Sequence, residues 1–169
     1  VMSFREISCR DLEINPFTAM NPDYILITAP DGKGVNPMTA GWGGLGVMWG
    51  LNTATVVVRP QRYTFGLMEN TDTYTIAYFH GNHREAFKLC GSASGRDTDK
   101  MKECGFTMGE TDGFRYIEQA DVVFCCKKIY AQDMLESCFV EKKIAEKWYP
   151  TKDYHRTYVG EIVKVLVRE

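Results

Sequence analysis

Two short clusters of polar side chains are the part of this chain best suited to hold an anion. The first cluster is Arg59, Arg62 and Thr64, where a β-branched run ends and a proline favours the start of a helix at residue 60. Guanidinium groups pair bidentately with phosphate oxygens, and the free N–H groups of a helix start add further donors. The alternative interpretation is a surface salt bridge of these arginines with Glu69 or Asp72.

The second cluster is Ser92, Ser94, Arg96 and Lys100, in a glycine-containing segment that reads as a loop followed by a helix. A solvated loop is the alternative here. The whole chain has a formal net charge of -2, which argues against a general nucleic-acid binder. Two basic clusters in a slightly acidic chain therefore indicate a small anionic ligand.

A glycine-rich segment, GWGGLG at residues 41–46, matches the dinucleotide-binding pattern GxGxxG. That fingerprint requires a helix that opens at the glycines, and here a turn and the next strand follow within a few residues. We expect instead a strand or loop whose backbone is closely approached by a flat group. Trp42 is expected beside a ligand, whereas Trp49 is expected in the core.

The cysteines and histidines do not form a metal-binding pattern. Six cysteines, at positions 9, 90, 104, 125, 126 and 138, include no CxxC pair. Cys125 and Cys126 would point to opposite faces of a strand. Buried, reduced thiols are the expected state, with a redox role for Cys90 as the alternative. His80 and His83 lack a third ligand nearby, so no metal site is expected.

These residues must be positioned by elements that read mainly as strands. Strands are predicted at 24–28, 38–42, 54–58, 74–79 and 157–167, with one or two more within 114–130. Helices are predicted at 60–69, at 82–89 with Asn82 and Glu85 as a capping box, at 97–104 ended by Gly105, and at 139–148. No regular alternation of strand and helix is present, which favours a β-barrel with helical additions.

Length and composition agree with one globular domain over residues 1–169. Apolar residues make up 44% and charged residues 25% of the chain. No segment reaches the roughly 18 uninterrupted apolar residues of a membrane helix, and no secretory h-region is visible near residue 1. Together with scattered thiols, this leads us to expect a cytoplasmic protein without a membrane association.

Five blocks of sequence resemble the flavin reductase-like, FMN-binding split-barrel family, and its flavoredoxin branch in particular. They are NPMTAGWGGLGVMW (36–49), TVVVRPQRYT (55–64), CGSASGRDTDK (90–100), KIYAQD (128–133) and HRTYVGEI (155–162). The resemblance implies a six-stranded Greek-key split β-barrel with short flanking helices. It also implies a homodimer with FMN at the subunit interface.

The resemblance implies a cofactor site as well. Asn36, Thr39, Ala40 and Trp42 would line the ring and the ribityl chain, while Arg59, Arg62 and Thr64 would hold the phosphate. Further cofactor contacts are expected from Met38, Gly41, Tyr63, Lys100, Gln132 and His155. The role of His155 stays open, because Lys152-Asp153-Tyr154 stands where relatives carry a short acidic-proline element.

Three functions fit this pattern. The first is an NAD(P)H-dependent flavin reductase, in which the cofactor performs the hydride transfer and no acid/base triad is needed. The second is a flavoredoxin-like carrier that holds FMN tightly and receives electrons from a redox protein. The third is a split-barrel protein that binds another ligand, such as haem or a pterin.

Overall fold

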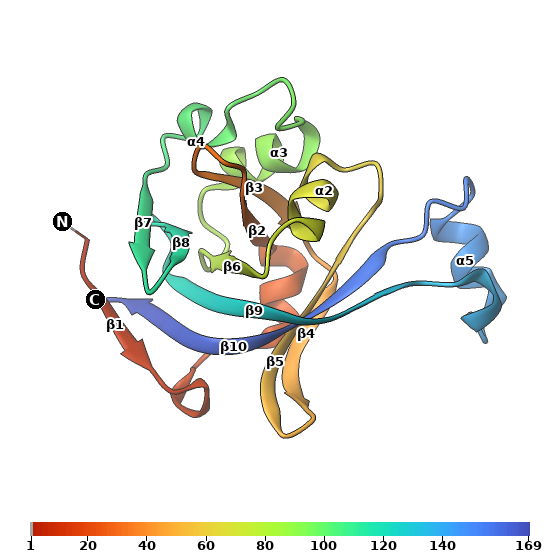
Figure 1. Cartoon of the computed structure of the whole chain (residues 1–169), viewed down its shortest axis with the longest axis horizontal. Coiled ribbons are helices and arrows are strands. Elements are labelled where there is room, and N and C mark those ends of the chain that lie inside the picture. Colours follow the sequence, from red (N-terminus) through yellow and green to blue (C-terminus); the bar gives the residue numbers. More distant parts are fainter. Residues whose placement is uncertain (1) are drawn as a thin grey trace.

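A curved, unclosed antiparallel sheet forms the body of the protein (Figure 1). The computed structural model describes residues 2–169. The sheet order is β3–β2–β6–β9–β10–β5–β4, β1 pairs with β10, and β7 and β8 form a separate hairpin. The strands are β1 (Phe4–Ile7), β2 (Ile25–Pro30), β3 (Val35–Ala40), β4 (Gly43–Met48), β5 (Leu51–Val58), β6 (Thr73–Tyr78), β7 (Met108–Thr111), β8 (Phe114–Ile117), β9 (Val122–Asp133) and β10 (Arg156–Arg168).

The helices are short, and three of them gather at one end of the sheet: α2, α3 and α4 (Figure 1). Their bounds are η1 (Cys9–Asp11), α1 (Pro16–Thr18), η2 (Ala19–Asp23), α2 (Tyr63–Glu69), α3 (Arg84–Ser92), α4 (Lys100–Glu103), η3 (Glu136–Cys138) and α5 (Lys142–Trp148). Across residues 2–169, none of the helices has the length and apolar character needed to cross a bilayer.

The sheet buries apolar side chains on both faces, as the two-residue period of a strand requires. On β2, Ile25 and Ile27 join one core, whereas Leu26 joins a second core. That second core includes Phe87 of α3. Cys126 and Cys125 divide between the two cores in the same way, which confirms the prediction that they face opposite sides.

The predicted fold class is confirmed, and the boundaries of several elements differ from the prediction. The strand predicted from residue 38 begins at Val35 and includes Pro37. A proline is tolerated there because β3 is an edge strand, with β2 as its one neighbour in the sheet. The glycine-rich segment forms β4, which pairs with β5 in a hairpin, so it opens no helix.

All four predicted helices begin later than the sequence predicts, and the one expected from residue 139 begins at Lys142 as α5. The helix α2 begins at Tyr63, because residues 60–62 form a turn closed by the bond from Arg62 N to Arg59 O. The cap of α3 is His83 in the left-handed conformation, and the predicted capping box does not form. The helix α4 begins at Lys100 because the preceding residues turn back onto Ser94 O. Its predicted end is confirmed, since Gly105 follows it with a φ of 67°.

The long strands β9 and β10 carry a projecting segment, residues 134–155, which we call the arm. The two strands pair along their length as far as Asp133 and Arg156. The arm between these residues contains η3 and α5 and extends away from the sheet (Figure 1). The helix α5 has no buried residue, although Ile144 and Trp148 are large apolar side chains.

Candidate functional site

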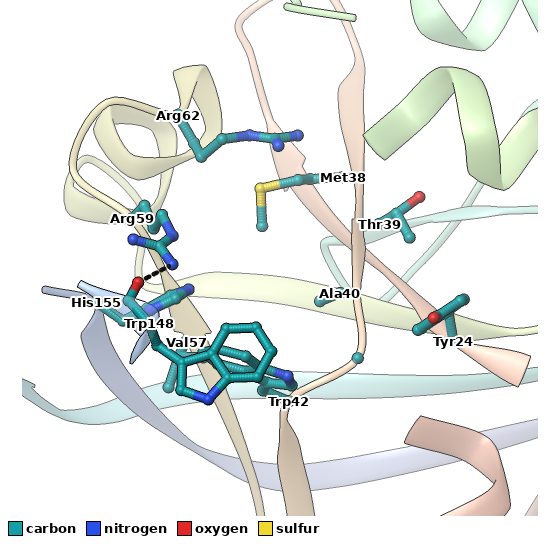
Figure 2. A pocket seen from close by; sticks show the side chains of 11 residues that line it. Tyr24, Met38, Thr39, Ala40, Trp42, Val57, Arg59, Arg62, Trp148 and His155 are labelled. Carbon is teal, nitrogen blue, oxygen red and sulfur yellow. Dashed lines mark hydrogen bonds between the residues drawn. The ribbon is translucent and has the colours of Figure 1, made fainter. Parts of the chain in front are cut away.

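A cavity of about 260 Å³ lies where β3, the end of β5 and the arm meet, and we call it the main pocket (Figure 2). Eight of the residues expected from the sequence to contact the cofactor line it: Met38, Thr39, Ala40, Gly41, Trp42, Arg59, Arg62 and His155. Tyr24, Val57 and Trp148 complete the wall. The main pocket therefore joins two sequence blocks, residues 38–42 and 59–62, with Trp148 and His155 of the arm.

A smaller cavity of about 150 Å³, the anion recess, adjoins the main pocket through Arg62. It brings together the two basic clusters of the sequence. Its lining contains three cationic side chains and several hydroxyl groups but no carboxylate: Gln61, Arg62, Tyr63, Thr64, Ser92, Ala93, Ser94, Arg96 and Lys100. The donor set is that of a site for an anion.

Arg62 is held at the junction of the two cavities by the last turn of α3. Its Nη1 donates to Gly91 O at 3.1 Å and its Nη2 donates to Cys90 O at 3.3 Å. Desolvation by burial lowers its pKa, and no carboxylate of residues 2–169 balances its charge. Since α2 has only seven residues, the side chains rather than a helix dipole carry this site.

Lys100 is a buried cation, with only 3% of its surface exposed. Its Nζ donates to Pro37 O and to Cys90 O, at 3.1 Å each. Burial lowers its pKa, and the positive charge of Arg62 lowers it further. A buried charge is costly unless it is paired, so two neighbouring cations without a carboxylate favour an anionic ligand.

Thr64 lines the recess, and Asn36 lies behind it as an internal support. The Nδ2 of Asn36 donates to Thr64 Oγ1 at 3.1 Å, and both side chains are buried. Gly95 lies against Asn36 and the ring of Tyr63, where a Cβ atom would collide with both. These contacts fix the loop that carries the second basic cluster.

Arg59, unlike Arg62, is paired with a carboxylate of the protein. Its Nη1 lies 2.7 Å from an Asp153 carboxylate oxygen, and its Nη2 donates to Trp148 O at 2.9 Å (Figure 2). The salt bridge considered from the sequence does form, but with a residue of the arm, while Glu69 pairs with Arg156. Asp153 also accepts a bond from Gln61, and these bonds lower its pKa to about 2.

Three aromatic side chains form one wall of the main pocket. The indole rings of Trp42 and Trp148 pack edge to face with their centroids 4.9 Å apart, and the centroid of the His155 ring lies 5.1 Å from that of Trp42. The Nδ1 of His155 is hydrogen-bonded to Tyr149 Oη at 2.7 Å. Burial, followed by the charge of Arg59, lowers the pKa of His155 to about 4, so this imidazole is neutral at pH 7.

The glycine-rich segment is closely approached by the protein's own groups. A Cβ atom at Gly41 would lie 2.6 Å from the ring of Tyr24, and one at Gly43 would collide with Thr55 O of the paired strand. Trp42, between these glycines, is 40% exposed. Trp49 was predicted in the core, and this was wrong: it sits in the β4–β5 turn and is 60% exposed, because a hairpin tip has no second layer over it.

Gln132 lies apart from the other expected residues. It lines a separate, mostly apolar cavity of about 300 Å³ with Tyr130, Leu135 and Phe139 at the base of the arm. Tyr24, Val57 and Trp148 were not predicted as site residues. Only Val57 carries a sequence signal, since the β-branched run at residues 54–58 predicts the strand that holds it. The other two are placed by the turn before β2 and by the arm.

Comparisons with known proteins agree with this geometry. The family model described as flavin reductase like domain matches residues 19–169. No curated protein matches the chain. Among solved structures, an FMN-binding domain of a flavin reductases-like enzyme from Shewanella baltica OS155 superposes with a TM-score of 0.69 at 16% identity, covering 98% of this chain and 78% of that one.

Two further structures are similar. The flavoredoxin of Desulfovibrio vulgaris (Miyazaki F) has a TM-score of 0.67 at 20% identity, covering 98% of this chain and 78% of that one. A Streptomyces globisporus NADH:FAD oxidoreductase has a TM-score of 0.64 at 14% identity, covering 87% of this chain and 78% of that one. At such identities the likeness concerns the fold.

Proposed function

The chain belongs to the flavin reductase-like domain family, and we propose that it binds FMN and passes a hydride from NAD(P)H through this flavin to an acceptor. The observation that carries the proposal is the anion recess, where Arg62 and the buried Lys100 face no carboxylate. The recess would hold the phosphate of FMN, and the adjoining main pocket would hold its ring. The structures of FMN-binding proteins with the same fold support this choice of flavin.

When bound, FMN would supply the two-electron chemistry that no side chain of this site provides. The protein's own residues bind and orient. Arg62 lies at the junction of the two cavities. The side chain of Thr39 is held in place because its Oγ1 donates to Phe87 O at 2.6 Å. Gly41 has no side chain, so the ring of Tyr24 can lie close to the backbone of the main pocket there. His155 offers an uncharged imidazole, which places no positive charge on that wall.

A homodimer is part of the proposal. The main pocket, at about 260 Å³, is below the roughly 300–1,000 Å³ typical of pockets that bury a ligand of this kind. The helix α5 also projects with no buried residue, and Val140 of the arm is fully exposed. A second copy would cover these apolar groups and complete the site. In such a dimer Gln132 would meet a flavin from the partner side.

A flavoredoxin-like electron carrier, reduced by a redox protein, is the second candidate. It is favoured by the Trp42–Trp148 contact, because the two indole rings take up room in the main pocket that a nicotinamide would need. The two candidates share the flavin and differ in the donor.

One experiment tests the flavin and the donor. The pigment of the purified protein is identified by absorption, extraction and chromatography against FMN and FAD, and the protein is then mixed anaerobically with NADH or NADPH. We expect FMN, bleached rapidly by one nicotinamide. FMN that only a redox protein reduces would favour the carrier. Recovery of FAD, haem or a pterin, or no flavin after reconstitution, would refute FMN binding.

A further inference from the structure

Two thiols lie in contact behind the anion recess. Cys90 is in the last turn of α3, Cys104 directly follows α4, and their Sγ atoms are 3.8 Å apart. Both are free cysteines. Cys90 is fully buried, whereas Cys104 is partly exposed.

We propose that Cys90 and Cys104 form a reversible disulfide that, when made, weakens the hold of the anion recess on its ligand. The effect on FMN rests on the function proposed above, while formation of the disulfide does not. The site would be modified by a peroxide, and its consequence would be a lower affinity for the phosphate end of the cofactor.

The two sulfurs must move closer before they can bond. A disulfide has its sulfurs about 2.05 Å apart, so these two must approach by about 1.7 Å from their contact distance of 3.8 Å. Cys90 is packed in the core that contains Phe79, Phe87 and Phe106, whose rings leave its side chain little freedom to turn. In the proposal, part of this approach falls on the end of α3, because its backbone carries the buried Cys90.

The end of α3 is the anchor of both cations in the recess. The carbonyl oxygen of Cys90 accepts from Arg62 Nη2 at 3.3 Å and from Lys100 Nζ at 3.1 Å. The next carbonyl, of Gly91, accepts from Arg62 Nη1 at 3.1 Å. Bonds of this length do not survive a displacement on the order of 1 Å. Oxidation would thus release Arg62 from the position in which it faces the recess.

The chemistry balances with hydrogen peroxide as the two-electron oxidant. The thiolate of Cys104 attacks one peroxide oxygen, the O–O bond breaks, and a sulfenic acid and one water result once the thiol proton is counted. The sulfur of Cys90 then attacks Cys104 Sγ; the S–S bond forms, the S–O bond breaks, and hydroxide leaves with the Cys90 proton as a second water. Two thiols are oxidised and one peroxide is reduced.

The burial of the pair sets the pace of this reaction. Desolvation raises the pKa of Cys90 to about 12 and also raises the pKa of Cys104. Since the thiolate is the nucleophile, a thiol with a raised pKa reacts slowly near neutral pH. The pair would therefore respond to sustained oxidant rather than to a brief exposure.

The test uses the whole chain, the variant Cys104→Ser, and Cys138→Ser as a matched control, because Cys138 is an exposed cysteine of the arm. Each protein is freed of pigment, treated with hydrogen peroxide or with dithiothreitol, alkylated and mapped by mass spectrometry. Parallel samples are titrated with FMN and with riboflavin by fluorescence. Riboflavin lacks the phosphate and so reports on the ring pocket alone.

We expect a Cys90–Cys104 disulfide in the wild type and in Cys138→Ser. FMN affinity should fall about 10-fold, as expected for losing one charge-assisted contact, and riboflavin affinity should stay nearly unchanged. Dithiothreitol should reduce the disulfide and restore the FMN affinity. Cys104→Ser should keep its FMN affinity under peroxide. A different disulfide, or none, would overturn the proposal, as would an oxidised pair with unchanged FMN affinity or with equal losses for both flavins. If the reduced protein binds neither flavin, the proposed function fails, together with this regulation of it, whereas mass mapping still decides whether the disulfide forms.

Discussion

Replacing Arg62 with alanine should weaken FMN binding far more than replacing Arg96. Arg62 lies at the junction of the two cavities with its remaining N–H groups available, whereas Arg96 is exposed, 5.5 Å from the Tyr63 ring centroid. A charge-assisted hydrogen bond contributes about 1.5–3 kcal/mol, so Arg62→Ala should cost roughly 10- to 100-fold in FMN affinity. A solvated arginine contributes about 0–1 kcal/mol, so Arg96→Ala should cost at most about 5-fold.

The fold should tolerate the Arg62 substitution. The Cys90 carbonyl keeps its bond from Lys100, and the Gly91 carbonyl, in a half-buried residue, can accept from water. We expect a loss of about 1 kcal/mol in unfolding free energy, which leaves the protein folded at room temperature.

The assay is a fluorescence titration of each apoprotein with FMN and with riboflavin, alongside urea unfolding. If Arg62 binds the phosphate, Arg62→Ala loses FMN affinity and keeps its affinity for riboflavin. Equal losses for the two flavins would show that Arg62 supports the ring pocket or the fold. A larger loss for Arg96→Ala would shift the phosphate towards the loop at residues 92–96, and the reasoning on buried cations would be refuted.

Three further predictions follow from the site and its surroundings. Gly41→Ala should reduce FMN affinity, because its Cβ would lie 2.6 Å from the Tyr24 ring, whereas Gly44→Ala, with open space around it, should bind normally in the same titration. Burial depresses the pKa of His155 to about 4 in the folded protein, so as pH falls below about 6.5 the unfolded chain takes up a proton before the folded one does, and the unfolding free energy should decline from there towards pH 4. In urea unfolding, His155→Gln should lose less unfolding free energy than the wild type over that interval. Identical pH profiles for the two proteins would contradict this. Sedimentation should give about twice 19.2 kDa, and a monomer that binds FMN tightly would contradict the dimer.

Local pattern was sufficient to predict most of the sheet and much of the site. Runs rich in β-branched residues predict strands, because these side chains pack well on a pleated sheet, and β5 and β10 form where such runs occur. The glycine-rich segment was correctly excluded as a dinucleotide motif, since a strand follows it too soon. Residues 38–42 and the cluster at 59–64 line neighbouring cavities, and their contact with FMN stays a prediction of the resemblance.

Other features depend on which distant segments meet, and no local pattern records this. The arm decides the partner of Arg59, because Asp153, 94 positions further along the chain, forms a salt bridge with the Arg59 guanidinium. Gln132 stands apart because the pairing of β9 with β10 directs it to another cavity. The burial of Lys100 and the contact of Cys90 with Cys104 arise because α3 and α4 both pack against β3. The residue types and their spacing along the chain determine the helices and strands and the chemistry available to the site. Tertiary packing decides which charged side chains are left without a partner, because burial and pairing depend on how the whole chain is folded.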